Sequence, residues 1–292
     1  MKERPPLSLL GFGRLGAALA TASQNVGYRI AAVAASSEET RRHAGAQGFC
    51  VYADNAAAAA AGELIILCVP DSQIEPVCRD LADSGSLRAD QILLHTSGAN
   101  AADVLLPAKA AGVAIGALHP LQSFAGTPAD AQAFAGSFFA IDGDTRAKDA
   151  AEDLALALGG RCLFIPPQDR ALYHAAAVMT SNYLTALLGI AEQLAAHWTP
   201  PGQALETLLP LAEATLANIR RQGTAAALTG PIARGDEATV DRHLRSLPPA
   251  LLPLYKELGL AALSLTADRL SSEHKAALRH LLSTPAQKEE LL

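Results

Sequence analysis

The sequence has few charged residues, no block of basic side chains and few cysteines, and each shortage excludes a class of protein. Charged residues make up 18% of the 292 positions, while 50% are hydrophobic. That much apolar surface is enough for a packed core and excludes a disordered chain. Lys and Arg are scattered and the net charge is −6. We therefore expect no nucleic-acid partner, because phosphate binding needs a concentrated basic surface.

The cysteines are widely separated and show no paired spacing. They are Cys50, Cys68, Cys78 and Cys162. This pattern is typical of reduced thiols in a cytosolic protein, and it predicts no metal site. The first residues run into a short apolar stretch with glycines and not into a signal-peptide core, which also favours a cytoplasmic location.

One segment is long and apolar enough to raise the question of a membrane. Ala171–Ala191 contains no Asp, Glu, Lys or Arg, but it carries His174, Ser181 and Asn182. Such groups are costly in lipid, so we predict a buried helix and no membrane partner.

Short apolar runs alternate with helix-forming stretches through the first half of the chain. The runs are Leu7–Leu10, Ile30–Ala34, Leu64–Val69, Ile92–His95, Val113–Leu118, Phe138–Ile141 and Cys162–Ile165. Leu15–Val26 and Ser72–Ala82 are two of the helical stretches between them. Strands that are apolar throughout and separated by helices are typical of a parallel sheet covered on both faces. We predict an α/β, doubly wound Rossmann domain.

After Pro166-Pro167 the pattern becomes helical. The predicted helices are Asp169–His197, Gln203–Gln222, Glu237–Leu247, Ala250–Asp268 and Glu273–Leu282. Proline pairs mark natural domain joints, and the length of the chain favours two domains. We predict an NADP-binding Rossmann domain over residues 1–166 and an all-α domain for substrate binding and dimerisation over residues 167–292.

A glycine-rich loop follows the first predicted strand. Gly11-Phe12-Gly13-Arg14-Leu15-Gly16 has the GxGxxG spacing and opens a helix. The first glycine of this pattern makes a tight turn, the second lets the backbone approach a pyrophosphate, and the third allows the helix to pack on the strand. Free N–H groups at the helix start face the phosphates. We predict that this loop binds a dinucleotide.

The end of the second strand distinguishes NAD from NADP. An Asp or Glu at this position usually accepts hydrogen bonds from the ribose of NAD. This chain has Ser36-Ser37, with Arg41 shortly after and Arg14 in the glycine loop. Hydroxyl and guanidinium groups suit a 2′-phosphate, so we predict NADP (NADPH) as the cofactor in preference to NAD.

Two alternatives stay open at this strand end. Glu38 or Glu39 would serve as the ribose acceptor of an NAD site. Ser36 would equally be the N-cap of the next helix, with Glu39 completing a capping box.

Further candidates follow the next strands, because ligands of such sheets bind outside the carboxyl ends of the strands. Val69-Pro70 would shape the cofactor shelf, and Ser97 would bind the nicotinamide amide or the substrate. His119 would give a proton to the alkoxide that forms when hydride reduces a carbonyl. The structural alternatives are a turn residue for Ser97 and a brace within its own loop for His119.

A polar stripe runs along the first helix of the second domain. Its members are His174, Ser181, Asn182 and Thr185, at i, i+7, i+8 and i+11. They fall within about 100° on one face of a mostly apolar helix, and buried polar groups need partners. A substrate cleft at the domain junction would supply them, and interhelical hydrogen bonds are the alternative. Tyr173 and Tyr183 lie off the stripe, where we expect packing.

A charged segment separates two later helices. We predict residues 229–236 to be a tight loop in which Arg234 binds a substrate carboxylate. Alternatively, Asp236 caps the following helix and Arg234 pairs with it.

These motifs together make the chain similar to bacterial Rossmann-like proteins with a C-terminal helical domain of unknown function. The matching pieces are Gly11–Gly16, Val69-Pro70-Asp71, His95-Thr96-Ser97-Gly98, His119-Pro120-Leu121-Gln122, Tyr173-His174 through Ser181-Asn182, and Gly230-Pro231 through Arg234-Gly235-Asp236. That group is related to the 6-phosphogluconate dehydrogenase-like, β-hydroxyacid dehydrogenase superfamily. The resemblance implies a 6-phosphogluconate dehydrogenase-like helical domain, NADP-dependent interconversion of a keto acid with a hydroxy acid, and a homodimer formed through the helical domain.

One position departs from the superfamily pattern. The superfamily typically has a Lys four residues before the Asn of the interdomain helix, as general acid or base. Asn182 matches the Asn, but Val178 stands at the Lys position. A valine cannot carry a proton, so His119 or His174 would replace the lysine.

We therefore predict an NADP-dependent oxidoreductase that reduces a small keto acid, with 2-dehydropantoate as the favoured substrate. The predicted site residues are His119, His174, Asn182 and Ser97 for catalysis and Ser181 and Arg234 for substrate binding. Some members of the resembling group are similar to ketopantoate reductases. The His-Pro at His119 is similar to that of prephenate dehydrogenases, which makes such an enzyme one alternative. A protein that binds NADP(H) without turnover is another, because fold does not fix function.

Overall fold

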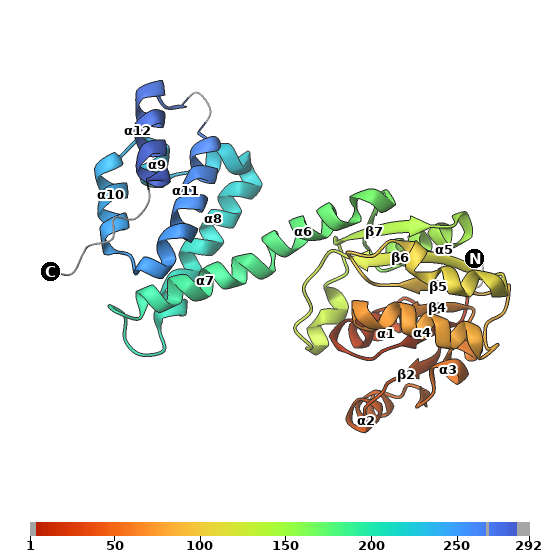
Figure 1. Cartoon of the computed structure of the whole chain (residues 1–292). Coiled ribbons are helices and arrows are strands. Elements are labelled where there is room, and N and C mark those ends of the chain that lie inside the picture. The colour runs from red at the N-terminus through yellow and green to blue at the C-terminus, as the bar shows by residue number, and fades with distance from the viewer. Residues whose placement is uncertain (1–3, 267–268, 285–292) are drawn as a thin grey trace. The chain divides into compact units, whose positions relative to one another are not determined.

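The computed structural model of the chain describes residues 4–266 and 269–284. The chain divides into two compact units, one running through Ala186 and one beginning at Leu187 (Figure 1). Helix α6 (Arg170–Thr180) therefore belongs to the sheet unit, although the sequence predicted the joint at residue 166. Within the described ranges, no helix is long and apolar enough to cross a membrane.

The first unit is built on one eight-stranded sheet with the order β3-β2-β1-β4-β5-β6-β7-β8. The strands are β1 (Leu7–Leu10), β2 (Ile30–Ala34), β3 (Val51–Tyr52), β4 (Leu64–Leu67), β5 (Ile92–His95), β6 (Ala114–Pro120), β7 (Phe138–Gly143) and β8 (Arg161–Phe164). The predicted α/β class is confirmed, and β3 is a short strand that the sequence analysis missed.

The prediction of an entirely parallel sheet is wrong at one pair of strands. All neighbouring strands run parallel except β7, which is antiparallel to β6. A parallel return needs a crossover, usually a full helix. The segment between β6 and β7 contains only the short 3-10 helix η2 (Pro128–Gln132), so the chain comes back in the opposite direction.

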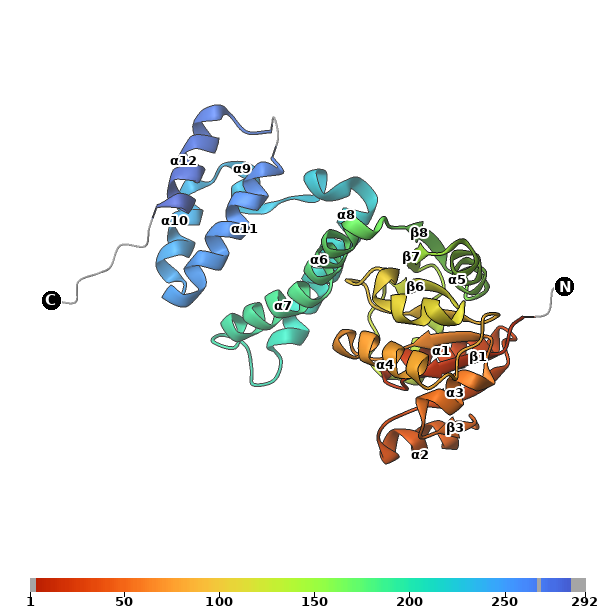
Figure 2. The same ribbon diagram turned by 45° about the vertical axis from the view of Figure 1, so that its right-hand side comes forward.

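Alternate strand residues supply two separate cores, one on each face of the sheet. Figure 2 shows the helices of this unit lying against the strands. In β4, Leu64 and Ile66 join the core that contains α1 (Arg14–Asn25) and α5 (Thr145–Ala157). Ile65 and Leu67 face the other core. That core is closed by α3 (Asn55–Ala61), α4 (Asp71–Asp83) and the 3-10 helix η1 (Ala102–Ala111). Burial on both faces explains why these strands read as continuous apolar runs.

The second unit is helical, as predicted. After α7 (Asn182–Ala195), its elements are α8 (Ala204–Ala227), α9 (Gly230–Arg234), α10 (Glu237–Ser246), the 3-10 helix η4 (Pro249–Leu251), α11 (Leu252–Ser264) and α12 (Ser272–Ser283). A small core joins the last helices through Val240, Leu263, Leu278 and Leu282. Of the predicted helix 250–268, residues Leu252–Ser264 form α11, and residues 267 and 268 lie outside the described residues.

The predicted helix 169–197 differs from the structure in two ways. It divides at Ser181 into α6 and α7, next to two hydroxyls that bond to carbonyls one turn back: Thr180 to Ala176, and Thr185 to Ser181. Such bonds often bend helices. The prediction of a buried helix is also wrong, because the only buried residue of α6 is Arg170, and large apolar side chains such as Met179 are exposed.

The predicted loop 229–236 contains the short helix α9. Pro231 lies in its first turn, where proline is well tolerated, and Gly235 ends it in the left-handed conformation with φ 74°. Asp236 then caps α10 by accepting a hydrogen bond from the Thr239 N–H, which confirms the capping part of the second sequence interpretation. Among the described residues Arg234 makes no ion pair with Asp236.

Candidate functional site

The carboxyl ends of β1, β4, β5 and β6 lie along one edge of the sheet, because these strands are parallel neighbours. The strand order reverses between β1 and β4. This topological switch point is where doubly wound sheets bind nucleotides. The loops that follow these strands carry the glycine motif, Val69-Pro70, Ser97 and His119.

The glycine loop has the geometry that its spacing predicts. Gly11 has φ 105°, and a Cβ there would lie 2.3 Å from the Cys68 carbonyl oxygen. A Cβ on Gly16 would lie 2.1 Å from the Gly11 oxygen, so both positions require glycine. A Cβ on Gly13 would meet nothing within 4 Å. This backbone therefore faces open space, as a residue that admits a phosphate must.

The first turn of α1 has free backbone N–H groups that suit an anion. Gly13 precedes the helix without a side-chain cap, and the first turn contains no acidic residue. Its N–H groups are thus not countered by a carboxylate. The side chains of Phe12 and Leu15 pack into the core, so these two residues offer only backbone groups, whereas Arg14 is exposed and lies against Gly126.

The guanidinium group of Arg41 lies beside the loop that follows β2. Arg41 Nη1 donates hydrogen bonds to the carbonyl oxygens of Ala35 (3.0 Å) and Ser36 (2.6 Å), which fixes the arginine beside the loop. Glu38 is directed towards Arg42, 3.8 Å away. The group fixed at this loop therefore has the charge that suits a 2′-phosphate.

The proposed Ser36 cap is wrong by one residue. Ser37 is the N-cap of α2 (Glu38–Ala46), and its Oγ accepts a hydrogen bond from the Thr40 N–H. Ser36 is exposed. Thr40 occupies the third position of the helix and bonds to the Ser37 hydroxyl, so the capping box with Glu39 does not form.

The loop after β5 is held by buried side chains. His95 is fully buried, with Nδ1 accepting from the Ser97 N–H (3.1 Å) and Nε2 3.0 Å from the Ala101 oxygen. Ser97 Oγ accepts hydrogen bonds from the N–H groups of Ala99 and Asn100. Both side chains therefore shape the turn, and the Ser97 hydroxyl, 4% exposed, donates no hydrogen bond to a described residue.

His119, at the end of β6, meets two residues of α6. Its Nδ1 lies 2.8 Å from the hydroxyl of Tyr173, and the two rings are edge-to-face with centroids 5.6 Å apart. The His174 ring lies 6.2 Å from that of His119. A Cβ on Gly98 would lie within 2.9 Å of both histidine rings, so this glycine makes their approach possible.

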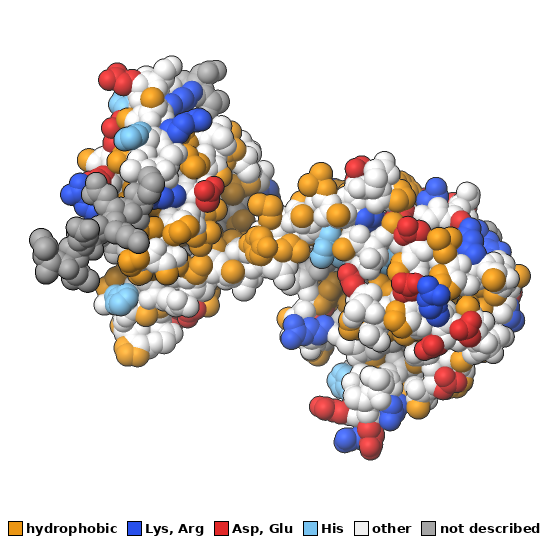
Figure 3. Space-filling model, viewed as in Figure 1, with side chains coloured by type: hydrophobic (Ala, Val, Ile, Leu, Met, Phe, Trp, Pro, Cys, Tyr) orange, Lys and Arg blue, Asp and Glu red, His pale blue; other side chains and the backbone are white. Residues whose placement is uncertain are grey.

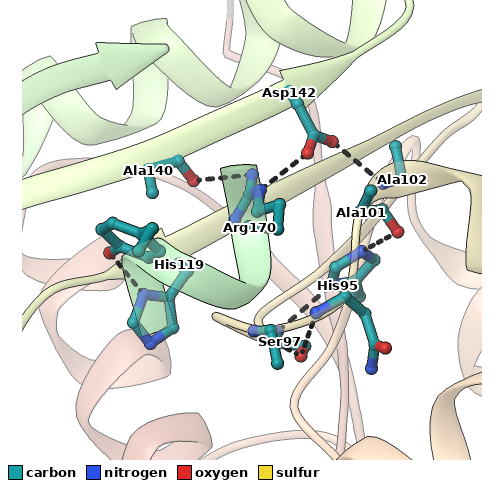
Figure 4. Close-up of polar contacts among 11 residues, drawn as sticks. His95, Ser97, Ala101, Ala102, His119, Ala140, Asp142 and Arg170 are labelled. Atoms are coloured by element: carbon teal, nitrogen blue, oxygen red, sulfur yellow. Dashed lines mark hydrogen bonds and ion pairs between the residues drawn. The ribbon is translucent and has the colours of Figure 1, made fainter. Parts of the chain in front are cut away.

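A buried ion pair fixes the start of α6 to the sheet (Figure 4). Arg170 Nε donates to the Asp142 carboxylate at 2.7 Å, and the arginine is 1% exposed. The second carboxylate oxygen of Asp142 accepts from the Ala102 N–H. Tyr173 and His174 follow at i+3 and i+4 from Arg170, on the same side of the helix. The ion pair therefore sets the position of both side chains.

The same surroundings keep two histidines neutral. Burial, together with the neighbouring His174, Arg170 and His95, lowers the pKa of His119 to about 4. Burial also lowers the pKa of His95 to about 4. Burial raises the pKa of Tyr173 to about 12, against the opposing effect of the Arg170 charge. At neutral pH the His119–Tyr173 pair is therefore an uncharged imidazole beside an uncharged phenol.

These residues open onto a cavity of about 580 Å³ in the first unit. Its lining residues are His119, Leu121, Gln122, Ser123, Leu163, Tyr173, His174, Ala176, Ala177, Val178, Thr180, Ser181, Asn182, Leu184 and Thr185. All of them are described residues, and they include no Asp, Glu, Lys or Arg. Proton transfer inside this cavity therefore falls to the histidines, the tyrosine and the hydroxyl groups.

The cavity brings together much of the predicted site. The whole polar stripe lines it, as does His119, and Val178 stands among them where the superfamily has lysine. Ser97 is buried in the neighbouring turn, and Arg234 ends α9 in the second unit. The expectation that Tyr173 only packs is wrong. Its partner His119 lies 54 positions earlier in the chain, so a stripe drawn on one helix could not reveal the contact.

Family comparisons agree with this two-part architecture. Residues 2–120 match the family described as a Rossmann-like domain. Residues 137–262 match a domain of unknown function, DUF2520. Each match covers less than half of the chain, and the two lie one after the other along it. A search of curated protein sequences gives no match.

Solved structures share the fold over nearly the whole chain. A Bacteroides fragilis protein provisionally described as an NADP oxidoreductase is 26% identical, over 89% of this chain and 98% of its own, with a TM-score of 0.75. The pyrroline carboxylate reductase of Plasmodium falciparum, solved with NADP bound, is 14% identical (94% and 98% covered, TM-score 0.60). An imine reductase from a Pseudomonas species is 21% identical (96% and 93%, TM-score 0.57).

The neutral histidines predict a pH dependence of stability. Unfolded histidine has a pKa of about 6.5, so between pH 6.5 and 4 the unfolded chain binds more protons at His119 and the free energy of unfolding falls as the pH falls. We expect His119→Gln to reduce this fall by roughly 2–3 kcal/mol, measured by urea unfolding followed by circular dichroism at several pH values. An unchanged pH dependence in the variant would show that His119 titrates normally in the folded protein.

Proposed function

We propose that this protein is an NADPH-dependent reductase of a small carbonyl substrate. One observation carries the proposal: the glycine loop and the loop that begins at His119 follow parallel strands of one sheet, so they lie along the same edge. Gly126, in the segment after β6, touches Arg14 of the glycine loop. A dinucleotide that binds the glycine loop and extends along this edge would reach the polar cavity.

The residues present fit NADPH. The open backbone at Gly13 and the uncapped start of α1 would hold the pyrophosphate, with Val69-Pro70 beside it. Arg41, Ser36 and Ser37 would hold the 2′-phosphate, and Arg14 lies exposed in the glycine loop. When bound, NADPH supplies hydride. The chain's own task is then to orient the substrate and to deliver a proton.

For the substrate we propose a keto acid, with 2-dehydropantoate as the first candidate. Asn182 and Ser181 line the cavity and would orient the carbonyl, with Ser97 in the adjoining turn. His119 and His174, whose ring centroids lie 6.2 Å apart, line the cavity and would deliver the proton. Arg234, exposed at the end of α9, is the proposed partner of the substrate carboxylate.

A second candidate is reduction of a C=N bond. Pyrroline carboxylate reductase and imine reductase share the fold of this chain, and Val178 leaves the cavity without the lysine of the hydroxyacid dehydrogenases. A protonated imine needs no proton donor when it accepts hydride, whereas a carbonyl does. The hydrogen-bonded pair of His119 and Tyr173 therefore favours the carbonyl.

We further propose that the protein is a cytoplasmic homodimer joined through its helical unit. Leu211 and Leu216 on α8 are 69% and 52% exposed, and hydrophobic side chains gather over the visible face of this unit (Figure 3). Exposed apolar patches of this kind mark interaction sites. All four cysteines are free thiols, which fits a reducing compartment.

If the helical unit forms the dimer interface, a charge placed in that interface should separate the two chains. We expect light scattering after gel filtration to give twice the mass of one chain for the wild type. Leu211→Arg should give a single-chain mass because it buries a charge in the interface, while the exposed Leu156→Arg on α5 of the sheet unit should not. A wild type with the mass of one chain would contradict the proposal.

The phosphate site predicts a change in cofactor preference. Arg41→Ala should weaken NADPH binding by roughly 10- to 100-fold, the value of a charge-assisted hydrogen bond, and should leave NADH affinity within about twofold. Arg42→Ala is the matched control, because that neighbour pairs with Glu38. Fluorescence titration of both cofactors measures the effect. Equal losses for NADPH and NADH would place Arg41 away from the 2′-phosphate.

Turnover is tested with a substrate panel. We expect oxidation of NADPH, followed by absorbance at 340 nm, with 2-dehydropantoate or another small keto acid, and slower oxidation with cyclic imine acids. His119→Ala should lower kcat at least about 100-fold with NADPH affinity nearly unchanged, and His174→Ala provides the comparison. Full activity in both variants would exclude the histidines from proton transfer.

A further inference from the structure

Three features of His119 bear on how a proton reaches the substrate. Its Nδ1 is hydrogen-bonded to the Tyr173 hydroxyl, its Nε2 makes no hydrogen bond with any described residue, and both side chains line the cavity. The edge of the ring that carries Nε2 lies against Gly98, the position with no side chain at the end of the β5 loop. Because Nδ1 is already bonded to Tyr173, Nε2 is the ring nitrogen that a ligand would meet.

We propose that Tyr173 is the proton source for the reaction and that His119 passes this proton on as a neutral imidazole. The proposal rests on the reductase function given above. In it, the Tyr173 hydroxyl donates to Nδ1, which fixes the hydrogen of the ring on Nε2, facing the substrate oxygen. Tyr173 acts through His119 and is a positioning and relay residue.

The step balances in atoms and charge. As a carbonyl carbon accepts hydride, the electron pair of the C=O bond moves to oxygen. That oxygen takes the proton from His119 Nε2, while Nδ1 takes the proton from the Tyr173 hydroxyl. The ring is neutral before and after, and the negative charge passes from the alkoxide to the phenolate. Solvent then returns a proton to Nε2 while Nδ1 gives its proton back to the Tyr173 phenolate, which restores the starting tautomer.

The surrounding charges favour this direction of transfer. The groups that face the pair are Arg170 and His174 from α6, His95 from β5 and Asp142 from β7. A cationic His119 is disfavoured there, since its pKa is about 4 and few molecules carry the extra proton at pH 7. The Tyr173 phenol, with a pKa of about 12, is a stronger acid than an alcohol, so an alkoxide can take its proton. The Arg170 charge favours the resulting phenolate.

The pair Tyr173→Phe and Tyr183→Phe tests the relay in the full-length protein. Tyr183 is 62% exposed on α7 and does not line the cavity, so it controls for the loss of a tyrosine hydroxyl. We expect Tyr173→Phe to lower kcat at least about 100-fold, to keep NADPH affinity within about twofold, and to change the pH profile of kcat. Tyr183→Phe should match the wild type. An unchanged kcat and pH profile in Tyr173→Phe would overturn the relay while leaving the reductase function in place.

A second measurement needs no substrate. Nitrogen-15 NMR of the histidine rings, assigned with His119→Gln, reports the tautomer and the pKa of His119. We expect a neutral ring at pH 7 with hydrogen on Nε2, and a shift of hydrogen to Nδ1 in part of the molecules in Tyr173→Phe. Hydrogen on Nδ1 in the wild type, or titration near pH 6.5, would overturn the relay. Absence of NADPH binding would overturn the reductase proposal independently of this result.

Discussion

The buried ion pair between Arg170 and Asp142 determines where the chemistry of the first unit can take place. It joins the first turn of α6 to β7, and the other carboxylate oxygen of Asp142 holds the start of η1. Tyr173 and His174 follow one turn later and reach His119 at the end of β6. A charge left without its partner at such a site costs about 3–5 kcal/mol. The arrangement of the cavity therefore depends on an ion pair whose separation has a high free-energy cost.

Burial is the main cause of the neutral forms of His119 and Tyr173, and the Arg170 charge acts beside it. Arg170 is always charged, so it disfavours a second positive charge on His119 and favours a negative charge on Tyr173. A lysine at Val178 would have supplied a proton directly, as in the resembling superfamily. In its absence, the hydrogen bond between a phenol and an imidazole provides another route. The glycine at position 98 leaves room for the ring.

The sequence predicted the parts of the structure that depend on local spacing. The bounds of β1, β2 and β5 agree exactly, and the glycine loop adopts its expected turn, because strand periodicity and GxGxxG are encoded within a few residues. Contacts between distant segments were not predictable in this way. Arg170 and Asp142 are 28 positions apart, and nothing in either neighbourhood indicates the pairing. The prediction of the direction of β7 was wrong for the same reason, because that direction depends on what the chain packs against after β6.

One measurement tests the central claim that this edge of the sheet delivers hydride and a proton to a carbonyl. The protein is incubated with NADPH deuterated at nicotinamide C4 and a panel of small keto acids, and the products are analysed by mass spectrometry. The account predicts a hydroxy acid with one deuterium on the former carbonyl carbon, formed by the wild type and strongly reduced in Tyr173→Phe. Tight binding of NADPH with no deuterium in any product would contradict the account and indicate a protein that binds the cofactor without turnover.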